Sequence, residues 1–186
     1  GYESSGYWDV LARFNERWAL QGGLRIATQT YDGSDDGEQW SPRFGVLYTL
    51  SPQTQLRASV GRFVQFQGIN ELQVEDGVDT FYPAQHAYHW ILGMDHAFAM
   101  GLDLRVEAFV KDYRHINPRF ENIFDPLVLL PEAEFDRVRI APDGARASGI
   151  EMMARLQPHG SWSGWLSYSW SRAEDHVDGM DVPRSW

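Results

Sequence analysis

Apolar and polar residues alternate with a period of two along eight segments of this chain. The segments are Tyr7–Asn15, Trp18–Tyr31, Phe44–Leu50, Leu56–Phe63, Tyr88–Asp95, Leu102–Lys111, Ile150–Leu156 and Leu166–Trp170. Successive side chains of a β-strand point to opposite faces, so this alternation predicts strands with one apolar and one polar face. The apolar positions carry even numbers. A shift of one residue would move charges such as Arg57 and Glu107 onto the apolar face, so the pattern also predicts the register.

The connections between these segments are alternately short and long. The short ones are Asn15–Arg17, Ser51–Thr54, Ala97–Gly101 and Gln157–Trp162. The long ones are Asp32–Ser41, Gln65–His86, Asp112–Ser148 and a stretch that begins near Arg172. This succession predicts an up-and-down antiparallel sheet with all long loops on one rim. Short turns on one side and long loops on the other are typical of bacterial outer-membrane β-barrels.

A soluble antiparallel sheet packed on a helix or on a second sheet would show the same alternation. The helix-like stretch Pro131–Arg137 is too short to cover so wide an apolar face, and the opposite face carries charges of both signs in mid-strand. Both features favour an all-β, up-and-down transmembrane barrel. Eight strands could close alone. Because the chain begins almost in a strand and stops within a loop, we instead expect part of a larger barrel and an internal section of a longer protein.

Aromatic residues agree with this placing of the two rims. Those toward the long loops on the apolar face are Trp8, Tyr88, Trp90, Tyr168 and Trp170, and those toward the short turns are Phe14 and Tyr48. Rings with an apolar body and a polar atom are enriched at the two interfaces of a membrane. The alternative is the general preference of strands for aromatic residues. We favour the interface interpretation.

Composition excludes several classes of function. The net charge of −10 argues against nucleic acid as a partner, because a phosphate-binding surface needs clustered Lys and Arg. Cysteine is absent, which excludes disulfides, thiolate metal sites and a cysteine nucleophile. The mean hydropathy is −0.43, and no run approaches the roughly 18 apolar residues of a spanning helix. Low hydropathy argues little against a barrel, since half of each strand is polar.

Two segments resemble the barrel of TonB-dependent outer-membrane receptors. Ser41–Leu72 (SPRFGVLYTLSPQTQLRASVGRFVQFQGINEL) has the family's Ser-Pro-Arg strand opening, tight turn, Gly-Arg-Phe strand end and Asn-Glu-Leu. Gly149–Asp175 (GIEMMARLQPHGSWSGWLSYSWSRAED) resembles a later hairpin of the same barrels. Shorter pieces that are similar to the family are Asn117–Arg119, Glu121–Asn122 and Pro183–Trp186.

The resemblance implies a 22-stranded barrel in the outer membrane of a Gram-negative bacterium, with an N-terminal plug inside it. It also implies uptake of a scarce solute, such as an iron chelate, a vitamin or a glycan, driven by TonB. The chain shows no plug, no TonB-contacting segment and no terminal strand. We therefore expect residues 1–186 to be a partial barrel domain. Two alternatives stay open: a passive outer-membrane channel or adhesin barrel, and a soluble β carbohydrate-binding module.

Two groups of residues are candidates for function. Six charges on the predicted wet face come from neighbouring strands and could pair into a ladder that fixes register or holds the plug. They are Asp95, Asp103, Arg105, Glu107, Glu151 and Arg155. Seven aromatic and amide residues lie where a strand emerges into a long loop, and loops on a rigid scaffold often carry binding. These predicted contacts of a small extracellular ligand are Phe63, Gln65, Phe66, Gln67, Asn70, Phe81 and Tyr82.

The sequence gives no reason to expect catalysis, a cofactor or a metal site. His86 and His89 point to opposite faces of a strand, so they cannot share an ion, and no Ser/His/Asp spacing forms a nucleophile elbow. Acidic runs in the loops lack the spacing of an EF-hand and are expected to be a solvated rim. These runs contain Asp32, Asp35, Asp36, Glu38, Glu75, Asp76, Asp79, Glu174, Asp175, Asp178 and Asp181, with Glu132 and Glu134 also in a loop.

Overall fold

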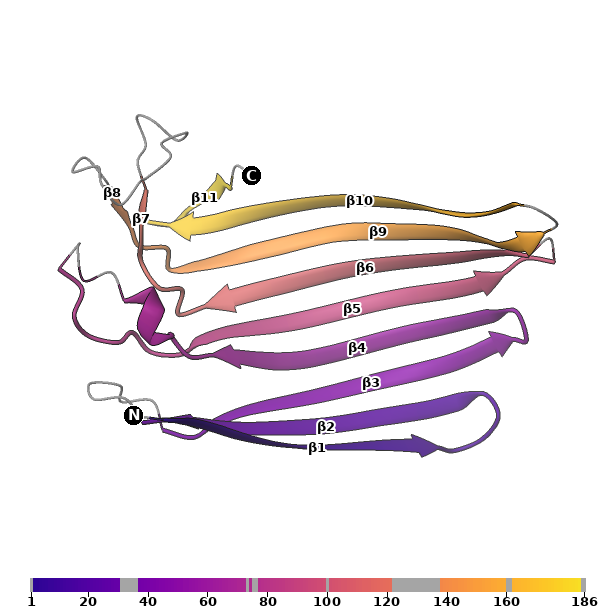
Figure 1. Cartoon of the computed structure of the whole chain (residues 1–186), viewed down its shortest axis with the longest axis horizontal. Coiled ribbons are helices and arrows are strands. Elements are labelled where there is room, and N and C mark those ends of the chain that lie inside the picture. Colours follow the sequence, from indigo (N-terminus) through magenta and orange to yellow (C-terminus); the bar gives the residue numbers. More distant parts are fainter. Residues whose placement is uncertain are drawn as a thin grey trace.

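The computed structural model describes residues 2–30, 37–72, 74, 77–99, 101–121, 138–159 and 162–184. Within them the chain forms eleven strands and one short 3-10 helix (Figure 1). The strands are β1 (Glu3–Arg13), β2 (Trp18–Gln29), β3 (Gln39–Ser51), β4 (Thr54–Gln65), β5 (Gln85–Ala97), β6 (Leu102–Arg114), β7 (Arg119–Glu121), β8 (Val138–Ile140), β9 (Gly144–His159), β10 (Trp162–Val177) and β11 (Met180–Pro183). The helix is η1 (Ile69–Glu71).

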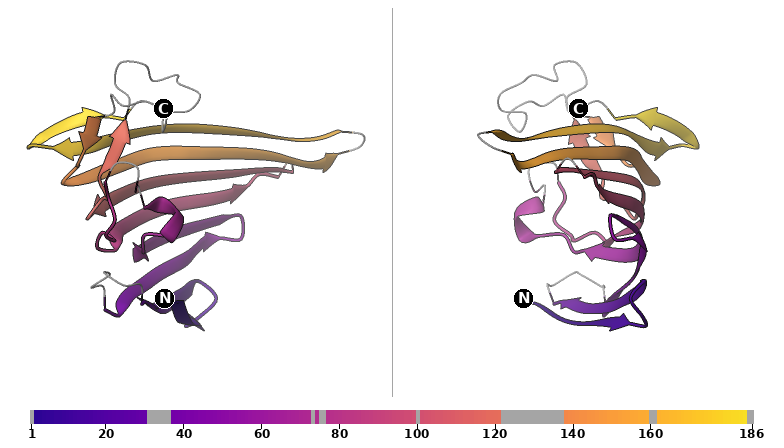
Figure 2. Two further views of the ribbon diagram at one scale, coloured as in Figure 1. Left: turned by 60° about the vertical axis from the view of Figure 1, so that its left-hand side comes forward. Right: turned by 90° about the vertical axis from the view of Figure 1, so that its right-hand side faces the viewer.

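Nine of these strands form one antiparallel sheet in the order β1-β2-β3-β4-β5-β6-β9-β10-β11. The remaining two, β7 and β8, pair with each other within the connection between β6 and β9. The large sheet is an open arc rather than a closed barrel, and η1 lies on its concave side (Figure 2). The prediction of an all-β, up-and-down antiparallel arrangement is confirmed.

We call the strands β1 to β6, β9 and β10 of the large sheet the wall. The register places the even-numbered side chains of the wall on one face. Along the ladders from β1 to β10, Val10 lies opposite Gly22, Leu56 opposite Met94 and Val106 opposite Met152. We call the even-numbered face of these strands the apolar face and the odd-numbered face the polar face. Phe66, in the segment that leads to η1, packs against Ala27 of the polar face, so the polar face is the concave one.

The short connections lie together at one end of the strands, which we call the turn end, and the long connections and η1 lie at the other, the loop end (Figure 1). Local chemistry explains the tightness of the turns. The side-chain oxygen of Asn15 accepts hydrogen bonds from the backbone N–H groups of Arg17 and Trp18, at 2.8 and 2.9 Å. Gly101 adopts a φ of +75°, a conformation that glycine reaches without strain.

The predicted long connection that begins near Arg172 is wrong. Strand β10 continues to Val177, and a two-residue turn at Asp178 and Gly179 leads directly into β11. Both turn residues have positive φ, at +50° and +77°, as the commonest tight hairpin turn requires. An Asp-Gly pair is a strong hairpin signal, so the sequence contained the information that corrects this prediction.

Several strands extend beyond the predicted segments at the loop end. β1 begins at Glu3, β3 at Gln39 and β9 at Gly144. The hydrophobic pattern did not reveal these extensions because their even positions are often polar. The predicted helical turn at Pro131–Arg137 lies outside the described residues.

Side chains are little buried in this fold. The buried apolar residues among those described are Ala19, Ala27, Phe66 and Ala84. Mid-sheet residues of the apolar face remain open instead: Leu92 is 64% exposed and Phe44 is 48% exposed. No helix within the described ranges is long and apolar enough to cross a membrane. The backbone ladders, rather than a packed core, therefore hold the wall together.

Candidate functional site

The apolar face is a continuous, uncovered surface across the inner strands. Its side chains, exposed by at least 41%, include Phe44, Val60, Trp90, Leu92 and Ile150. A shallow groove between β3, β4, β5 and β6 on this face is lined by Phe44, Val46, Ala58, Val60, Trp90, Leu92, Ala108 and Val110. Exposed apolar patches of this extent mark contact with a membrane or another protein.

Aromatic rings occupy both ends of this face. At the turn end, Trp18 and Tyr48 on β2 and β3 pack with their ring centroids 4.4 Å apart. Toward the loop end, Tyr88 and Trp90 stack along β5 at 6.3 Å. Amphipathic rings at two levels with aliphatic side chains between them match the girdles of a membrane-spanning sheet.

The polar face carries an ion-pair network in mid-sheet. Arg105 on β6 approaches Asp95 on β5, with Nε 2.7 Å from Oδ1. Arg57 on β4, which was not among the predicted ladder residues, lies 3.3 Å from Asp95 and 3.8 Å from Glu107. Gly93 stands opposite Arg57, and an added Cβ there would lie 3.3 Å from the guanidinium nitrogens. The glycine therefore leaves room for the arginine to reach across β5.

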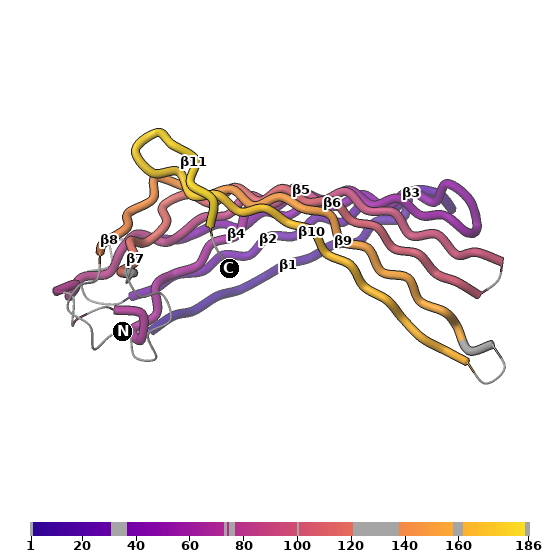
Figure 3. The backbone as a smooth tube through the Cα atoms, turned by 90° about the horizontal axis from the view of Figure 1, so that it is seen from above, coloured from indigo at the N-terminus to yellow at the C-terminus, as the bar shows by residue number. Residues whose placement is uncertain are grey.

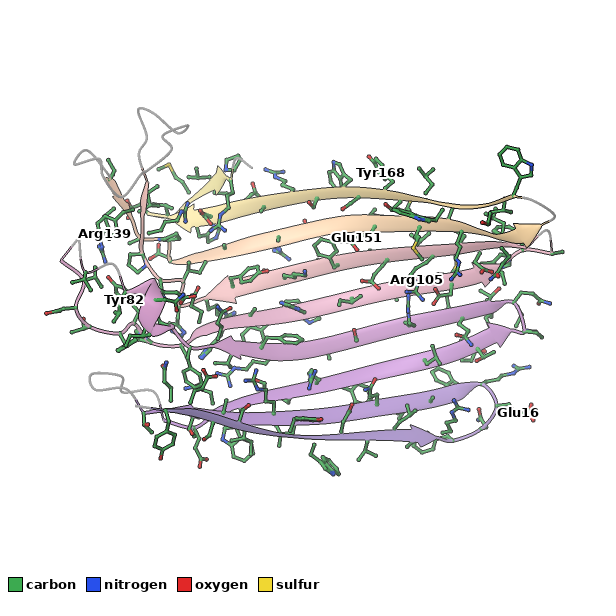
Figure 4. All side chains as sticks on the ribbon, viewed as in Figure 1. Glu16, Tyr82, Arg105, Arg139, Glu151 and Tyr168 are labelled. Atoms are coloured by element: carbon green, nitrogen blue, oxygen red, sulfur yellow. The ribbon has the colours of Figure 1, made fainter. Side chains whose placement is uncertain are left out.

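The other predicted ladder residues lie on the same face, farther along the sheet. Asp103 accepts a hydrogen bond from the side-chain amide of Gln157 at 2.6 Å and stands opposite Arg155 in the register. Glu107 stands opposite Glu151, an adjacency of like charges that is unfavourable by itself. Figure 4 shows Arg105 and Glu151 over the middle strands of the sheet.

The predicted ligand contacts separate into buried and accessible members. Phe66 and Gln67 are only 8% and 4% exposed. The Gln67 carbonyl accepts a hydrogen bond from Gln29, and its side-chain oxygen accepts one from the Tyr82 backbone N–H, both at 2.8 Å. Its side-chain nitrogen donates to the Glu71 carbonyl. The structure therefore gives Gln67 the geometry of a residue that holds the loop on the wall.

The accessible members lie around the loop end. Gln65 and Asn70 are exposed, while Phe81 and Tyr82 are half-buried. Figure 4 shows Tyr82 and Arg139 at this end and Glu16 at the opposite one. Phe63 is 38% exposed and stacks on His89, with ring centroids 4.3 Å apart.

A recess on the polar face lies beneath that aromatic pair. It encloses about 170 Å³ and is lined by Asp9, Gln21, Gly23, Arg43, Phe44, Gly45, Ser59, Val60, Gly61, Phe63, His89 and Ile91. Space for the recess is left by three glycines on adjacent strands, which carry no side chains: Gly23, Gly45 and Gly61. An added Cβ on Gly61 would lie 3.0 Å from the Arg43 side chain, so this glycine is needed for the recess to keep its present shape.

A buried carboxylate at the loop end was missed by the sequence analysis. Asp175, predicted to lie in a solvated acidic loop, is instead in β10 and only 3% exposed. Its carboxylate binds Arg119 of β7 at 2.7 Å and Arg184 at 2.8 Å. The pairs tie the segment between β6 and β9 to the β10–β11 hairpin. The odd number of Asp175 places it on the concave polar face, so its burial could have been inferred from the sequence pattern. Its two arginine partners could not have been inferred in this way.

The predicted loop placement is also wrong for Glu174 and Asp181, which lie in β10 and β11, although Asp181 is exposed as the solvated-rim interpretation expects. Glu38 and Asp79 are exposed loop residues, and Asp178 is in the hairpin turn. The remaining acidic residues of that prediction, Asp32, Asp35, Asp36, Glu75, Asp76, Glu132 and Glu134, lie outside the described residues. Among the described residues, no three His, Cys, Asp or Glu side chains come together in a way that could hold a metal ion.

A family model for the β-barrel of TonB-dependent receptor-like proteins matches residues 2–185. The chain therefore belongs to the TonB-dependent receptor β-barrel family. No curated protein matches the sequence.

Similar folds occur among solved structures. The alcaligin outer-membrane receptor FauA from Bordetella pertussis matches with a TM-score of 0.63 at 20% identity, covering 93% of this chain and 30% of that one. The FrpB iron transporter from Neisseria meningitidis matches at 0.66 and 16%, covering 96% and 27%. The copper transporter OprC matches at 0.70 and 17%, covering 97% and 30%. The chain thus spans less than a third of each of these proteins.

Proposed function

We propose that this chain forms part of the wall of an outer-membrane receptor that takes up a scarce solute with energy supplied through TonB. The observation that carries the proposal is the uncovered apolar face, because apolar side chains on so many adjacent strands need a lipid environment. Family membership supplies the link to TonB. In this placement the apolar face contacts lipid, and the concave polar face lines the interior of a barrel.

The loop end faces the outside of the cell and the turn end faces the periplasm. This orientation follows the general asymmetry of bacterial outer-membrane barrels, which have short periplasmic turns and longer external loops. The described loop end supports it, since η1 and the β7–β8 pair form there. Residues 1–186 are then one section of a barrel domain, and a plug domain and further strands belong to the complete protein.

The polar face has two roles in this proposal. The pairs among Arg57, Asp95 and Arg105 fix the strands relative to one another, since cross-strand opposite charges stabilise a sheet. Glu151 stands opposite Glu107 and is well placed to receive a cation from the plug. A cation of the plug bound along this face would reduce the electrostatic repulsion between Glu107 and Glu151.

The external mouth binds the solute through the accessible residues Phe63, Gln65, Asn70, Phe81 and Tyr82, while Phe66 and Gln67 hold the loop that presents them. An iron chelate, a vitamin and a glycan are the candidate solutes. Because similar structures include an alcaligin receptor, an iron transporter and a copper transporter, a metal-bearing solute is the first to test.

The test uses the complete protein in its own bacterium. A strain that lacks the gene is complemented with the wild-type gene or with a Phe63→Ala, Asn70→Ala double variant, and uptake of labelled iron chelates, vitamins and glycans is compared in the presence and absence of TonB. Uptake of one solute that requires both TonB and the two mouth residues is expected. Uptake that persists without TonB would contradict the proposal and indicate a passive channel. Loss of the protein from the outer-membrane fraction would contradict the membrane wall itself.

A further inference from the structure

Three side chains from the ends of neighbouring strands meet at the loop end. Gln39 is the first residue of β3, Arg62 lies near the end of β4, and His86 is the second residue of β5. The terminal nitrogen Nη2 of Arg62 lies 3.0 and 3.3 Å from the two ring nitrogens of His86 and 3.3 Å from the side-chain oxygen of Gln39. We call these three residues the His86 cluster. The loop end that carries it and the short turns lie at opposite ends of the strands (Figure 3).

The His86 cluster connects strand ends that the backbone ladders do not connect. The ladder between β3 and β4 begins at Arg43 and Gly61, so the first residues of β3 are not part of it. Arg62 joins them to β4, because its nitrogen Nη1 donates to the backbone carbonyl of Trp40 at 2.6 Å while Nη2 reaches His86. The cluster therefore holds together the ends of three strands, and with them the stems of the connections that lead into β3 and β5.

The hydrogen bonds of the cluster require a neutral imidazole. Arginine can only donate, so a ring nitrogen of His86 must accept from Nη2 of Arg62. When the proton is on Nε2, that nitrogen also donates to the Gln39 oxygen, which lies 3.2 Å away, and Nδ1 accepts from the arginine. A ring that is protonated on both nitrogens has no acceptor to offer. Protonation of His86 would therefore bring two donors, and two cations, face to face.

The other groups around His86 do not compensate for an added positive charge. The printed partners of Arg62 are an amide oxygen, a backbone carbonyl and the imidazole, and its Nε is buried without a hydrogen-bond partner among the described residues. Arg114 of β6 stands opposite His86 in the register, and the ring of His115 packs edge-on against the His86 ring with centroids 5.1 Å apart. The charged and titratable groups that these contacts bring to His86 are all bases, so they oppose its protonation.

We propose that His86 is a pH-dependent switch that holds the stem of the connection between β4 and β5 when it is neutral and releases it when it is protonated. Histidine gains its charge as the pH falls from about 8 to about 5. The order that the cluster supplies is therefore present above that range and is lost as the pH falls through it. The Gln67 amide, which also holds this connection, does not titrate, so the release is partial. The switch deepens the proposed function and rests on it for one consequence: the released connection carries Asn70, Phe81 and Tyr82, so acid should weaken solute binding at the mouth.

Another histidine of the loop end has the opposite chemistry and supplies the control. His176 on β10 contacts the carboxylate of Asp181 on β11. Protonation strengthens a contact between an imidazole and a carboxylate, whereas it breaks the contact between His86 and Arg62. Carboxylates themselves generally take up protons at lower pH than histidine, so the window of the switch is separate from theirs.

The experiment uses the complete protein in lipid vesicles with one nitroxide spin label. The label is attached through Asn70→Cys in η1 or, as a control site at the turn end, through Gln53→Cys. Its mobility is recorded by electron paramagnetic resonance from about pH 8 to about pH 5. The variants are H86Q and R62Q, with H176Q as the matched control. The glutamine of H86Q can accept from Arg62 and donate to Gln39 at every pH in this range.

The mobile fraction of the label at position 70 should rise roughly threefold or more in the wild type and in H176Q as the pH falls through the histidine range. It should stay low in H86Q, and the label at position 53 should not respond. R62Q should also lose the response, because no guanidinium then opposes protonation, and this variant keeps the test decisive if H86Q folds poorly. A response that persists in H86Q and R62Q, or a wild type that does not respond, would overturn the switch. Uptake that persists without TonB defeats the proposed function and leaves this label response in place, whereas a silent label defeats only the switch.

Discussion

The wall and the loop end of this chain are ordered by different interactions. In the wall, from β1 to β10, antiparallel backbone ladders run almost uninterrupted, while apolar side chains such as Leu92 stay open on one face. At the loop end, the described order depends on buried polar side chains, among them Gln67, which binds Gln29, and Asp175, which binds Arg119, both at long separations in the sequence. The comparison teaches that the wall is specified locally, through alternation, whereas the loop end is specified by a few long-range pairs.

The largest effect is expected from a charge placed on the apolar face. Leu92→Lys should destabilise the complete protein in lipid vesicles by about 2–4 kcal/mol, because a lysine near the middle of a lipid-facing strand loses its hydration. Urea unfolding in vesicles measures the change. The neighbouring substitution Ile91→Lys is the matched control, since Ile91 is on the polar face and should cost less than about 1 kcal/mol. Equal destabilisation by the two lysines would remove the distinction between the faces.

The next effect should be confined to the loop end. Asp175→Asn weakens two charge-assisted hydrogen bonds to Arg119 and Arg184 and should cost about 1.5–3 kcal/mol locally. Hydrogen exchange should accelerate in β7 and β11 and stay unchanged in β5. Asp178→Asn, in the exposed hairpin turn, should change stability by less than about 0.5 kcal/mol. If exchange in β5 accelerated as much as in β7, the loop end and the wall would not be separable.

Gln67→Ala should destabilise the loop between β4 and β5 by about 1–2 kcal/mol, since the Tyr82 N–H and the Glu71 carbonyl each lose a partner. Asn70→Ala, at an exposed position three residues away, should leave thermal stability unchanged while weakening solute binding. Melting curves and binding isotherms of both variants distinguish the two roles. A Gln67 variant with wild-type stability and reduced binding would instead make Gln67 a direct contact.

The smallest effect should come from the ion pairs of the wall. Arg105 is 51% exposed, so solvent screens its pairing with Asp95, and a double-mutant cycle of Arg105→Gln and Asp95→Asn should give a coupling below about 1 kcal/mol. Urea midpoints of the two single variants and the double variant supply the coupling. A coupling of several kcal/mol would show that the polar face carries more of the wall's stability than its backbone ladders suggest.

The alternation of apolar and polar residues predicted the strands of the wall because each strand has one apolar and one polar face, and both are visible in its own sequence. Val106 and Met152, both even-numbered, lie opposite each other in the register, as the pattern predicts. Each of the eight predicted segments falls within a strand of the sheet or overlaps one. The predicted segments end where even-numbered positions stop being apolar. Asp112 and Arg146 are charged, so the sequence pattern there resembled a loop although β6 and β9 continue. The hairpin at Asp178 and Gly179 was missed because it follows a polar stretch.

The candidate site was less predictable from sequence. Phe63, Gln65 and Asn70 could be placed near the mouth because strand ends and loop starts are visible in the pattern. That Gln67 is buried depends on Gln29, 38 residues earlier, and the burial of Asp175 depends on Arg119, 56 residues earlier. Pairs at such separations leave no periodic trace in a single sequence. The pattern therefore identifies which face a residue occupies but not which partner it meets.

The central claim is that the even-numbered face meets lipid and the odd-numbered face meets water. Single nitroxide spin labels at each position from 103 to 110 of β6, in the complete protein reconstituted in lipid vesicles, test it most directly. Collisions with oxygen, which concentrates in lipid, should peak at 104, 106, 108 and 110, and collisions with a water-soluble nickel complex should peak at 103, 105, 107 and 109. Labels at Leu104, Val106 and Val110 that reach neither reagent, or that reach the nickel complex as readily as the odd positions, would contradict the account.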